Sequence, residues 1–184
     1  MKNRVRIVGG AWRSRVLRFP ATIGLRPTAD RLRETLFNWL GQELCGLACL
    51  DLFAGSGALG FEAASRGASA VTLVERDPRV FRALVESRRL LGAQQVEVLQ
   101  ADALAFLASD SRCFDVVFLD PPYRSHFLPA VLACLPPHLR PAARVYVESA
   151  ERPEIPSSYN VLRRSHAGQA QCLLVQWQAD EPPP

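Results

Sequence analysis

Short apolar runs alternate along most of the chain with longer segments in which apolar residues recur every three or four positions. The apolar runs are residues 49–53, 70–75, 96–99, 116–119 and 145–147. Most of them are apolar at nearly every position, which is typical of strands that are buried on both faces of a parallel sheet. The pattern therefore predicts five strands in the core of the fold.

The segments between these runs have the period and the end signals of helices. They span residues 58–66, 78–91, 104–108 and roughly 127–135. The second has the clearest limits, because Asp77 is a typical N-cap residue, Pro78 fits the first helical position and Gly92 fits the C-terminal end. Alternating strands and helices predict an α/β fold with a mostly parallel sheet and helices on both faces.

The C-terminal part departs from this alternation. Residues 161–164 and 172–177 have the composition of strands, but only residues 165–171 separate them. That connection is too short for a crossover helix, so the sequence predicts an antiparallel hairpin. We expect the Pro-rich tail at residues 179–184 to be disordered.

The N-terminal part predicts a hairpin followed by a helix. Residues 4–8 and 15–19 fit two strands whose polar positions are mostly Arg, with Gly9-Gly10 between them. A two-stranded ribbon is marginally stable alone, so we expect it to lean on the rest of the protein or on a ligand. The helix begins near Thr28, its candidate N-cap, and ends before Gly41. Its apolar face consists of Leu32, Leu36, Phe37 and Leu40.

These elements divide the chain into an arm of residues 1–27, a main domain of residues 28–178 and the tail. The chain has 184 residues, of which 48% are hydrophobic, so its composition excludes a disordered or collagen-like protein and a disulfide-stapled miniprotein.

Charge is distributed unevenly along the chain. The formal net charge is +4, but residues 1–34 carry nine basic and two acidic side chains, which leaves a net −3 on the remainder. Such asymmetry suggests a basic segment that binds a polyanion. The alternative is an Arg-rich solvated surface, since all but one of the basic residues are Arg; the lack of any acid before Asp30 favours the first interpretation. The candidate phosphate-binding residues are Arg4, Arg6, Arg13, Arg15, Arg18 and Arg26.

The five cysteines include no CxxC pair, which predicts reduced, mostly buried thiols and neither a metal site nor a disulfide framework. No apolar run is long enough to span a membrane, and the basic N-terminus lacks the apolar core of a signal peptide. An organelle transit peptide is less favoured, because the segment continues directly into structured motifs. We therefore expect a cytoplasmic protein without a membrane partner.

A glycine-rich loop follows the first strand of the main domain. Gly55, Gly57 and Gly60 form G-x-G-x-x-G, and Glu75 follows at the distance of a ribose-binding acid, a pattern that alone also fits a dinucleotide dehydrogenase. Asp51 precedes the loop, where it would repel a pyrophosphate but attract the cationic amino and sulfonium groups of S-adenosylmethionine. Asp102 follows the third strand and could accept a hydrogen bond from the adenine amine. Each acid alone could be a solvated strand end or a helix cap; together they favour S-adenosylmethionine.

The sequence Asp120-Pro121-Pro122-Tyr123 follows the fourth strand of the main domain. The exocyclic amine of a purine is a poor nucleophile, because its lone pair is conjugated into the ring. A carboxylate and a proline carbonyl that accept its hydrogens would aim the lone pair at a methyl donor. The consecutive prolines stiffen the loop, and the tyrosine ring offers a surface on which a flipped base can stack. The alternative is a Pro-rich strand exit whose Asp caps a turn.

With these motifs, nearly the whole chain resembles bacterial 16S rRNA guanine-N2 methyltransferases of the RsmD type. The matching segments are residues 6–10, 24–40, 50–60, 120–123, 146–148 and 167–169. The most particular of them is the segment 24–40, because the glycine loop and the Asp-Pro-Pro-Tyr motif occur in a wider superfamily. Ser14 departs from the family, which usually has Gly at that position.

The resemblance implies a seven-stranded class I (Rossmann-like) methyltransferase fold, S-adenosylmethionine as donor, and methylation of a guanine in 16S rRNA. We expect a monomer that acts on a small-subunit particle. The implied donor-binding residues are Asp51, Phe53, Gly55, Gly57, Glu75, Arg76, Asp102 and Ala103. The implied guanine-binding and catalytic residues are Asp120, Pro121, Pro122 and Tyr123.

Two other functions stay open at this point. DNA adenine-N6 methylation is compatible with the same motif, although such enzymes usually carry a target-recognition domain and the connections here are short. A non-catalytic RNA-binding or ribosome-assembly factor could retain the fold, but the intact glycine loop and Asp-Pro-Pro-Tyr motif argue against it.

Overall fold

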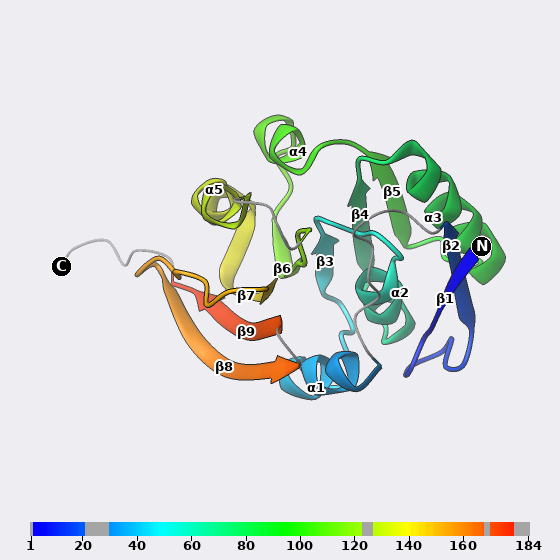
Figure 1. The fold of residues 1–184 in the computed structure, drawn as a ribbon, viewed down its shortest axis with the longest axis horizontal. Coiled ribbons are helices and arrows are strands. Elements are labelled where there is room, and N and C mark those ends of the chain that lie inside the picture. The colour runs from blue at the N-terminus through cyan, green and yellow to red at the C-terminus, as the bar shows by residue number, and fades with distance from the viewer. Residues whose placement is uncertain (1, 21–29, 123–126, 168–169, 179–184) are drawn as a thin grey trace.

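A seven-stranded sheet forms the centre of the computed structural model, which describes residues 2–20, 30–122, 127–167 and 170–178 (Figure 1). The strands in spatial order are β5 (Val96–Gln100), β4 (Ala70–Glu75), β3 (Ala48–Asp51), β6 (Phe114–Leu119), β7 (Leu139–Ser149), β9 (Ala170–Trp177) and β8 (Tyr159–Ala167). The first five strands are parallel, and β9 is antiparallel to both of its neighbours. This arrangement confirms the predicted fold class and the C-terminal hairpin.

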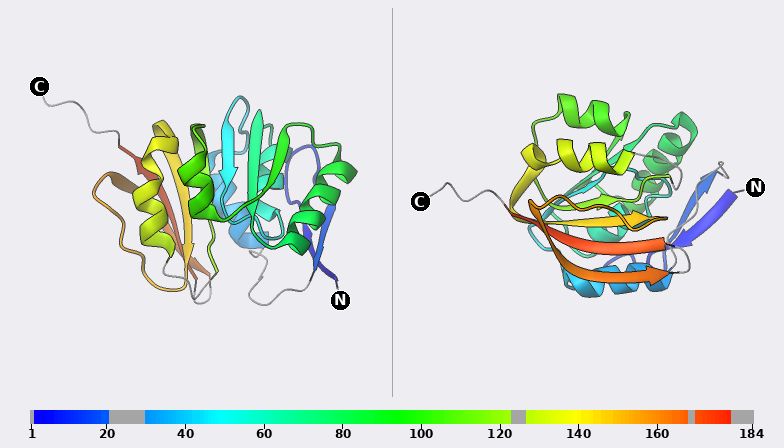
Figure 2. Two further views of the ribbon diagram at one scale, coloured as in Figure 1. Left: turned by 90° about the horizontal axis from the view of Figure 1, so that it is seen from above. Right: turned by 60° about the vertical axis from the view of Figure 1, so that its left-hand side comes forward.

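Helices cover both faces of the sheet. On one face lie α1 (Asp30–Leu40), α2 (Ala58–Ser65) and α3 (Pro78–Leu91) (Figure 2). On the other face lie α4 (Ala103–Ser109) and α5 (Phe127–Cys134). A 3₁₀ turn (Pro136–His138) connects α5 to β7. Successive residues of a strand point to opposite faces. Thus Val116 and Phe118 of β6 join the first core, while Val117 and Leu119 join the second.

Helix limits agree with the sequence where the end signals are strong. The Asp77 carboxylate accepts hydrogen bonds from the amides of Arg79 and Val80 at the start of α3, and Gly92 ends that helix with φ of 63°. The apolar face predicted for α1 is buried. The expected N-cap, Thr28, lies outside the described residues, as do the proposed boundary at residues 27–28 and the tail.

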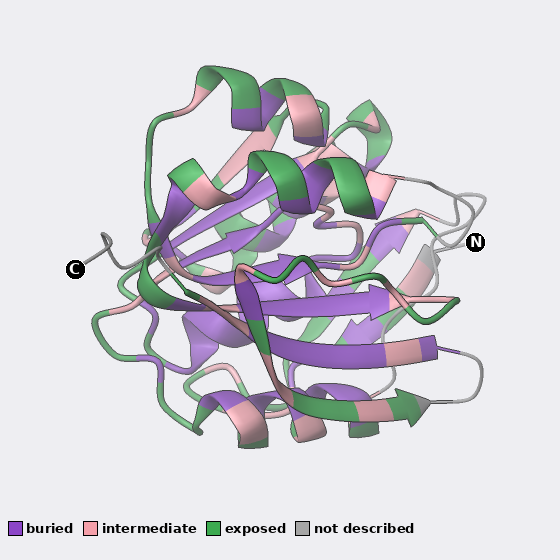
Figure 3. Ribbon diagram, turned by 90° about the vertical axis from the view of Figure 1, so that its left-hand side faces the viewer, coloured by how far each residue is buried: buried purple, intermediate pink, exposed green. Residues whose placement is uncertain are grey.

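The three C-terminal strands extend further than expected. β7 begins at Leu139, which pairs with Phe114 of β6, and the register then shifts before pairing resumes at Arg144. Arg140, Pro141 and Ala142 lie in this irregular stretch and are exposed, so an apolar run marks only the buried second half of the strand. β8 and β9 pair as far as Ala167 and Ala170, which shortens the predicted connection. Figure 3 shows why: β8 is the outer strand and is largely exposed, so it lacks the continuous apolar run of its buried neighbours.

The arm is a hairpin of β1 (Lys2–Arg6) and β2 (Val16–Pro20) that packs on the main domain. Val5, Leu17 and Phe19 point inward and belong to the core shared with α1, α2 and α3. This confirms the expectation that the hairpin leans on the rest of the protein.

A buried carboxylate fixes the turn of the arm to α2. Glu62 is 0% exposed and accepts hydrogen bonds from the amides of Val8 (2.8 Å) and Gly9 (2.7 Å). It also forms ion pairs with Arg66 (2.9 Å) and with Arg33 (3.5 Å), whose side chain is likewise 0% exposed. Burial lowers the pKa of the Arg33 guanidinium, and the negative charges of Asp30 and Glu62 oppose that shift.

The close approach of the arm's turn to the end of α2 explains the Gly9-Gly10 pair. Gly10 has φ of +71°, and a Cβ built there would lie 1.9 Å from the Ser65 carbonyl oxygen. Ser14, further along the same turn, also has a positive φ of 70°. A residue with a Cβ is strained in this conformation, which accounts for the glycine that the family usually has at this position.

The expectation of mostly buried cysteines is wrong. Cys45, Cys113 and Cys134 are exposed, and Cys49 and Cys172 are buried; all five are free thiols. The three exposed cysteines lie beside strands or on the outer side of a helix. The apolar character of cysteine does not by itself indicate these exposed positions. No helix in the described part of the chain is long and apolar enough to cross a membrane.

Candidate functional site

The four acids singled out in the sequence meet at one edge of the sheet. Asp102, Glu75, Asp51 and Asp120 stand at or just beyond the ends of β5, β4, β3 and β6, which are neighbours in that order. The carboxyl ends of parallel strands in open α/β sheets form the usual ligand-binding crevice. The four acids predicted to bind the donor or the guanine therefore share one edge, called here the acidic edge.

Asp51 is buried at the centre of the acidic edge. Its side chain accepts a hydrogen bond from the Gly60 amide at 3.0 Å, in the first turn of α2. Burial raises the pKa of Asp51 to about 7; the negative charge of Glu75 adds to the shift and the Gly60 amide opposes it. This carboxyl group consequently changes its charge near neutral pH.

The glycine loop connects β3 to α2 and is tied to the end of β4. Gly57 has φ of +75°, and a Cβ there would come within 2.8 Å of the side chains of Phe61 and Leu84. The Gly55 amide donates a hydrogen bond to Glu75 at 3.0 Å, and the Asp77 amide donates a second at 2.8 Å. The half-buried Glu75 carboxylate thus lies directly against the loop.

Three further predicted donor-binding residues lie in the segments that follow β3, β4 and β5. Phe53 is half-buried, Arg76 is exposed at the end of β4 and Ala103 is buried at the start of α4.

Asp102 has a structural role that the sequence left open. It is the N-cap of α4, and its Oδ1 accepts hydrogen bonds from the amides of Leu104 (3.0 Å) and Ala105 (3.3 Å). Both bonds use the same oxygen atom. The cap fixes the position of the carboxylate at the acidic edge, and a contact with adenine stays a prediction.

The Asp-Pro-Pro-Tyr motif leaves β6 at the same edge. Asp120 is half-buried, Pro121 is buried and Pro122 is exposed, while Tyr123 lies outside the described residues. The last pair in the register between β6 and β7 is Leu119 with Val147. Asp120 is consequently next to Glu148 in the continuation of the two strands.

Glu148 was not among the predicted site residues, although the sequence segment 146–148 was among those that resemble the RsmD type. Its side chain is 4% exposed and accepts a hydrogen bond from the Tyr146 hydroxyl at 3.1 Å. Burial raises the pKa of Tyr146, and the negative charges of Glu148 and Asp120 add to this shift. The negative charges of both carboxylates thus act on the same hydroxyl group.

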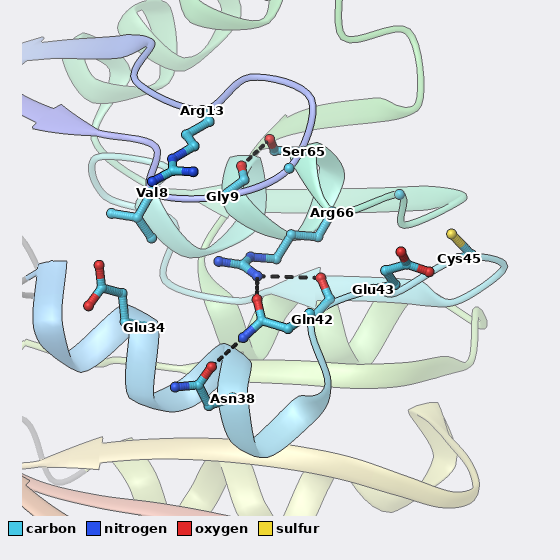
Figure 4. Close-up of a pocket in the computed structure, with 12 residues that line it drawn as sticks. Val8, Gly9, Arg13, Glu34, Asn38, Gln42, Glu43, Cys45, Ser65 and Arg66 are labelled. Carbon is cyan, nitrogen blue, oxygen red and sulfur yellow. Dashed lines mark hydrogen bonds between the residues drawn. The ribbon is translucent and has the colours of Figure 1, made fainter.

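A polar pocket of about 750 Å³ lies at the opposite edge of the sheet (Figure 4). It is lined by the turn of the arm, the outer face of α1 and the end of α2. Arg66 donates hydrogen bonds to the carbonyl and the side-chain oxygens of Gln42, which in turn donates to Asn38. None of the four acids lines this pocket. Among the described residues, no three His, Cys, Asp or Glu side chains are placed to hold a metal ion.

The predicted phosphate-binding arginines differ in their surroundings. Arg4 and Arg18 are exposed and directly opposite each other in the hairpin. Arg6 is exposed and pairs with Asp30 at 3.3 Å. Arg13 and Arg15 are exposed in or beside the turn, and Arg13 lines the polar pocket. Arg26 lies outside the described residues.

Known proteins match both the sequence and the fold. A family model described as "Conserved hypothetical protein 95", the RsmD family, matches residues 5–176. The chain is 42% identical over 182 residues to "Ribosomal RNA small subunit methyltransferase D" of Escherichia coli K12, an alignment that covers 96% of this chain and 92% of that protein. The chain belongs to the RsmD family.

Other members of the RsmD family agree with this assignment. The protein of the same name from Haemophilus influenzae is 41% identical and is covered over 95% of both chains. The solved structure of the Escherichia coli protein yhhF matches with a TM-score of 0.89 and 39% identity, covering 97% of this chain and 100% of that one. Membership of the RsmD family confirms the resemblance found in the sequence and the methyltransferase fold.

Proposed function

We propose that this chain transfers the methyl group of S-adenosylmethionine to the exocyclic N2 amine of a guanine in 16S rRNA. The observation that carries the proposal is the acidic edge, where Asp120-Pro121-Pro122 leaves β6 beside the three acids of β3, β4 and β5. Relatives named for small-subunit rRNA methylation support the choice of rRNA as substrate.

The acidic edge fits a cationic donor. Asp51 provides a negative charge beside the glycine loop, Glu75 can accept hydrogen bonds from ribose hydroxyls, and Asp102 can accept one from the adenine amine. Bound S-adenosylmethionine supplies an electrophilic methyl group on a sulfonium. The chain itself contributes orientation, because Gly57 has φ of +75° and no room for a Cβ against Phe61 and Leu84, so the loop keeps a turn that a residue with a side chain could not adopt.

The acceptor amine would be held by Asp120 and by the carbonyl oxygen of Pro121. Both accept its hydrogens, which aims the nitrogen lone pair at the methyl carbon. The new N–C bond forms as the S–C bond breaks, and the amine proton leaves to Asp120 or to water. Tyr123 would stack on the guanine ring.

Asp51 gives this site a pH dependence. Because the pKa of Asp51 is raised to about 7, the folded protein binds a proton between roughly pH 4 and 7 that the unfolded chain releases. The free energy of unfolding accordingly falls as the pH rises through this window, and the whole decrease is present above pH 7. A cationic donor favours the ionised form, so donor binding should release a proton and strengthen between pH 6 and 8.

We expect Asp51→Asn to separate these two effects. The amide oxygen can still accept from Gly60, so at pH 8 the ligand-free variant should unfold at a temperature no lower than wild type. Donor affinity should fall about tenfold to a hundredfold, since a charged hydrogen bond contributes about 1.5–3 kcal/mol. Calorimetry at pH 6 and pH 8 should find pH-dependent affinity in wild type alone. The same pH dependence in both proteins would remove Asp51 from the donor site.

The Arg4 and Arg18 pair provides a phosphate-binding surface on the arm. Like charges directly opposite on two strands repel each other, and an anion between them relieves that repulsion. For Arg4→Ala/Arg18→Ala, we expect weaker rRNA binding and a salt dependence whose log–log slope falls by about one unit per arginine. Donor affinity should not change.

Filter-binding titrations at several salt concentrations measure this slope. Arg89→Ala is a suitable control, because Arg89 is an exposed arginine on α3 that pairs with Glu86. If the double variant keeps the wild-type slope, the hairpin does not bind phosphates.

DNA adenine-N6 methylation is the competing function, and one assay distinguishes the two. Labelled S-adenosylmethionine is incubated with rRNA or plasmid DNA, and the product is digested to nucleosides. Label in N2-methylguanosine from rRNA supports the proposal, whereas label in N6-methyl-2′-deoxyadenosine from DNA overturns it. Running free 16S rRNA beside small-subunit particles tests the preference for a particle, and light scattering of the active protein tests whether it is a monomer.

A further inference from the structure

Glu148 lies beside the residue that would hold the acceptor amine. β6 and β7 are parallel neighbours, and their register pairs Leu119 with Val147. The next residues along the two strands are Asp120 and Glu148. Adjacent strands lie about 4.8 Å apart, so two carboxyl-bearing residues are side by side at this point of the acidic edge.

The Glu148 side chain is oriented by its neighbours. It is 4% exposed and accepts a hydrogen bond from the hydroxyl of Tyr146, two residues earlier on the same face of β7. The residue opposite it on β9 is Cys172, which is also buried. A carboxylate has about four lone-pair positions, so one that is held by Tyr146 can also accept a hydrogen from a ligand.

Two adjacent carboxylates match the hydrogen-bonding edge of guanine. Guanine presents the N1 hydrogen and the N2 amine side by side as donors. Adenine presents its amine beside a ring nitrogen that is an acceptor. This ring nitrogen would face a carboxylate with no hydrogen between them. A buried acceptor left without a donor is costly, so such a site rejects the wrong base strongly.

We propose that Glu148 accepts the N1 hydrogen of the target guanine while Asp120 accepts a hydrogen of its N2 amine. Glu148 is then the residue that selects guanine over a purine whose N1 carries no hydrogen. This inference rests on the proposed function, because it names the determinant of substrate choice at the same site.

The test replaces the target guanine in the rRNA with 2-aminopurine, which keeps the N2 amine but has an unprotonated N1. Wild type should prefer guanine by about a hundredfold in kcat/KM. Glu148→Gln keeps the shape of the side chain, and its amide can donate to the unprotonated N1. The preference of this variant should fall to near one.

A matched control and a second variant keep the test decisive. Glu86→Gln makes the same change on the exposed face of α3 and should keep the wild-type preference. Tyr146→Phe leaves the carboxylate but removes the hydroxyl that holds it, so it should weaken the preference by a smaller factor, about fivefold. If Glu148 has only a structural role, its variants lose stability while the preference stays unchanged, and that result overturns the inference.

The two proposals fail in different ways. If wild type forms no N2-methylguanosine, the proposed function is wrong. If wild type forms it, the deciding measurement is the base preference of Glu148→Gln, or of Tyr146→Phe where Glu148→Gln does not fold. If that variant discriminates against 2-aminopurine as strongly as wild type, only the role of Glu148 is wrong.

Discussion

Replacing Asp120 with alanine is expected to lower the rate of methyl transfer by about 10²- to 10⁴-fold and to leave donor affinity near that of wild type. The carboxylate would be lost from the position that aligns the amine lone pair, and such positioning and electrostatic effects have this magnitude. Donor affinity should change little, because the proposed donor contacts come from β3, β4 and β5. Single-turnover kinetics with rRNA and calorimetry with the donor measure the two quantities separately.

Asp110→Ala is the control for this variant. Asp110 follows α4 at the opposite edge of the sheet and pairs with Arg112 at 2.8 Å. Its removal should leave the rate of methyl transfer unchanged. Wild-type turnover by Asp120→Ala would show that the acceptor amine is held by other groups.

The second large effect is expected at Glu62, which joins the arm to α2. Glu62→Ala would leave two amides and two arginines, one of them fully buried, without their shared acceptor. Breaking a buried ion pair in this way costs about 3–5 kcal/mol. For a chain of this length, the midpoint of thermal unfolding should fall by about 10 °C.

Calorimetric or fluorescence-monitored unfolding tests this prediction. Glu86→Ala removes an exposed carboxylate from α3 and should change the free energy of unfolding by less than about 1 kcal/mol. An equally small effect for Glu62→Ala would mean that the arm is held by its apolar contacts alone.

Local signals in the sequence predicted the elements whose ends are fixed by the chain itself. The limits of α3 follow from Asp77, Pro78 and Gly92, and each of these residues acts within one turn of the helix. β4 is buried from its second to its fifth residue and was predicted over the same residues as observed. β8 and the first half of β7 were not found in full, because most of their residues are exposed and form no continuous apolar run.

Charge was the least informative signal, because its meaning depends on burial. Arg33 counts toward the basic N-terminal segment, yet it lies inside the protein between Asp30 and Glu62. The positive charge that residues 1–34 expose is therefore smaller than the sequence suggests. The remaining arginines also differ in surroundings, as the pairing of Arg6 with Asp30 illustrates.

The candidate site was predictable where parallel strands end. Once strands were assigned, their carboxyl ends had to lie at one edge, and this brought Asp51, Glu75, Asp102 and Asp120 together. Glu148 was not predicted as a site residue, because its position beside Asp120 depends on the register of two strands that are distant in sequence. The capping role of Asp102 became clear only when the start of α4 was known.

Mapping of rRNA modification in living cells tests the central claim most directly. Small-subunit rRNA is isolated from a strain without this gene, and from the same strain complemented with wild type or with Asp120→Ala, and the modified nucleosides are located by mass spectrometry. The proposed function predicts one N2-methylguanosine that disappears on deletion, returns with wild type and stays absent or scarce with Asp120→Ala. A complete and unchanged set of rRNA modifications in the deletion strain would contradict it.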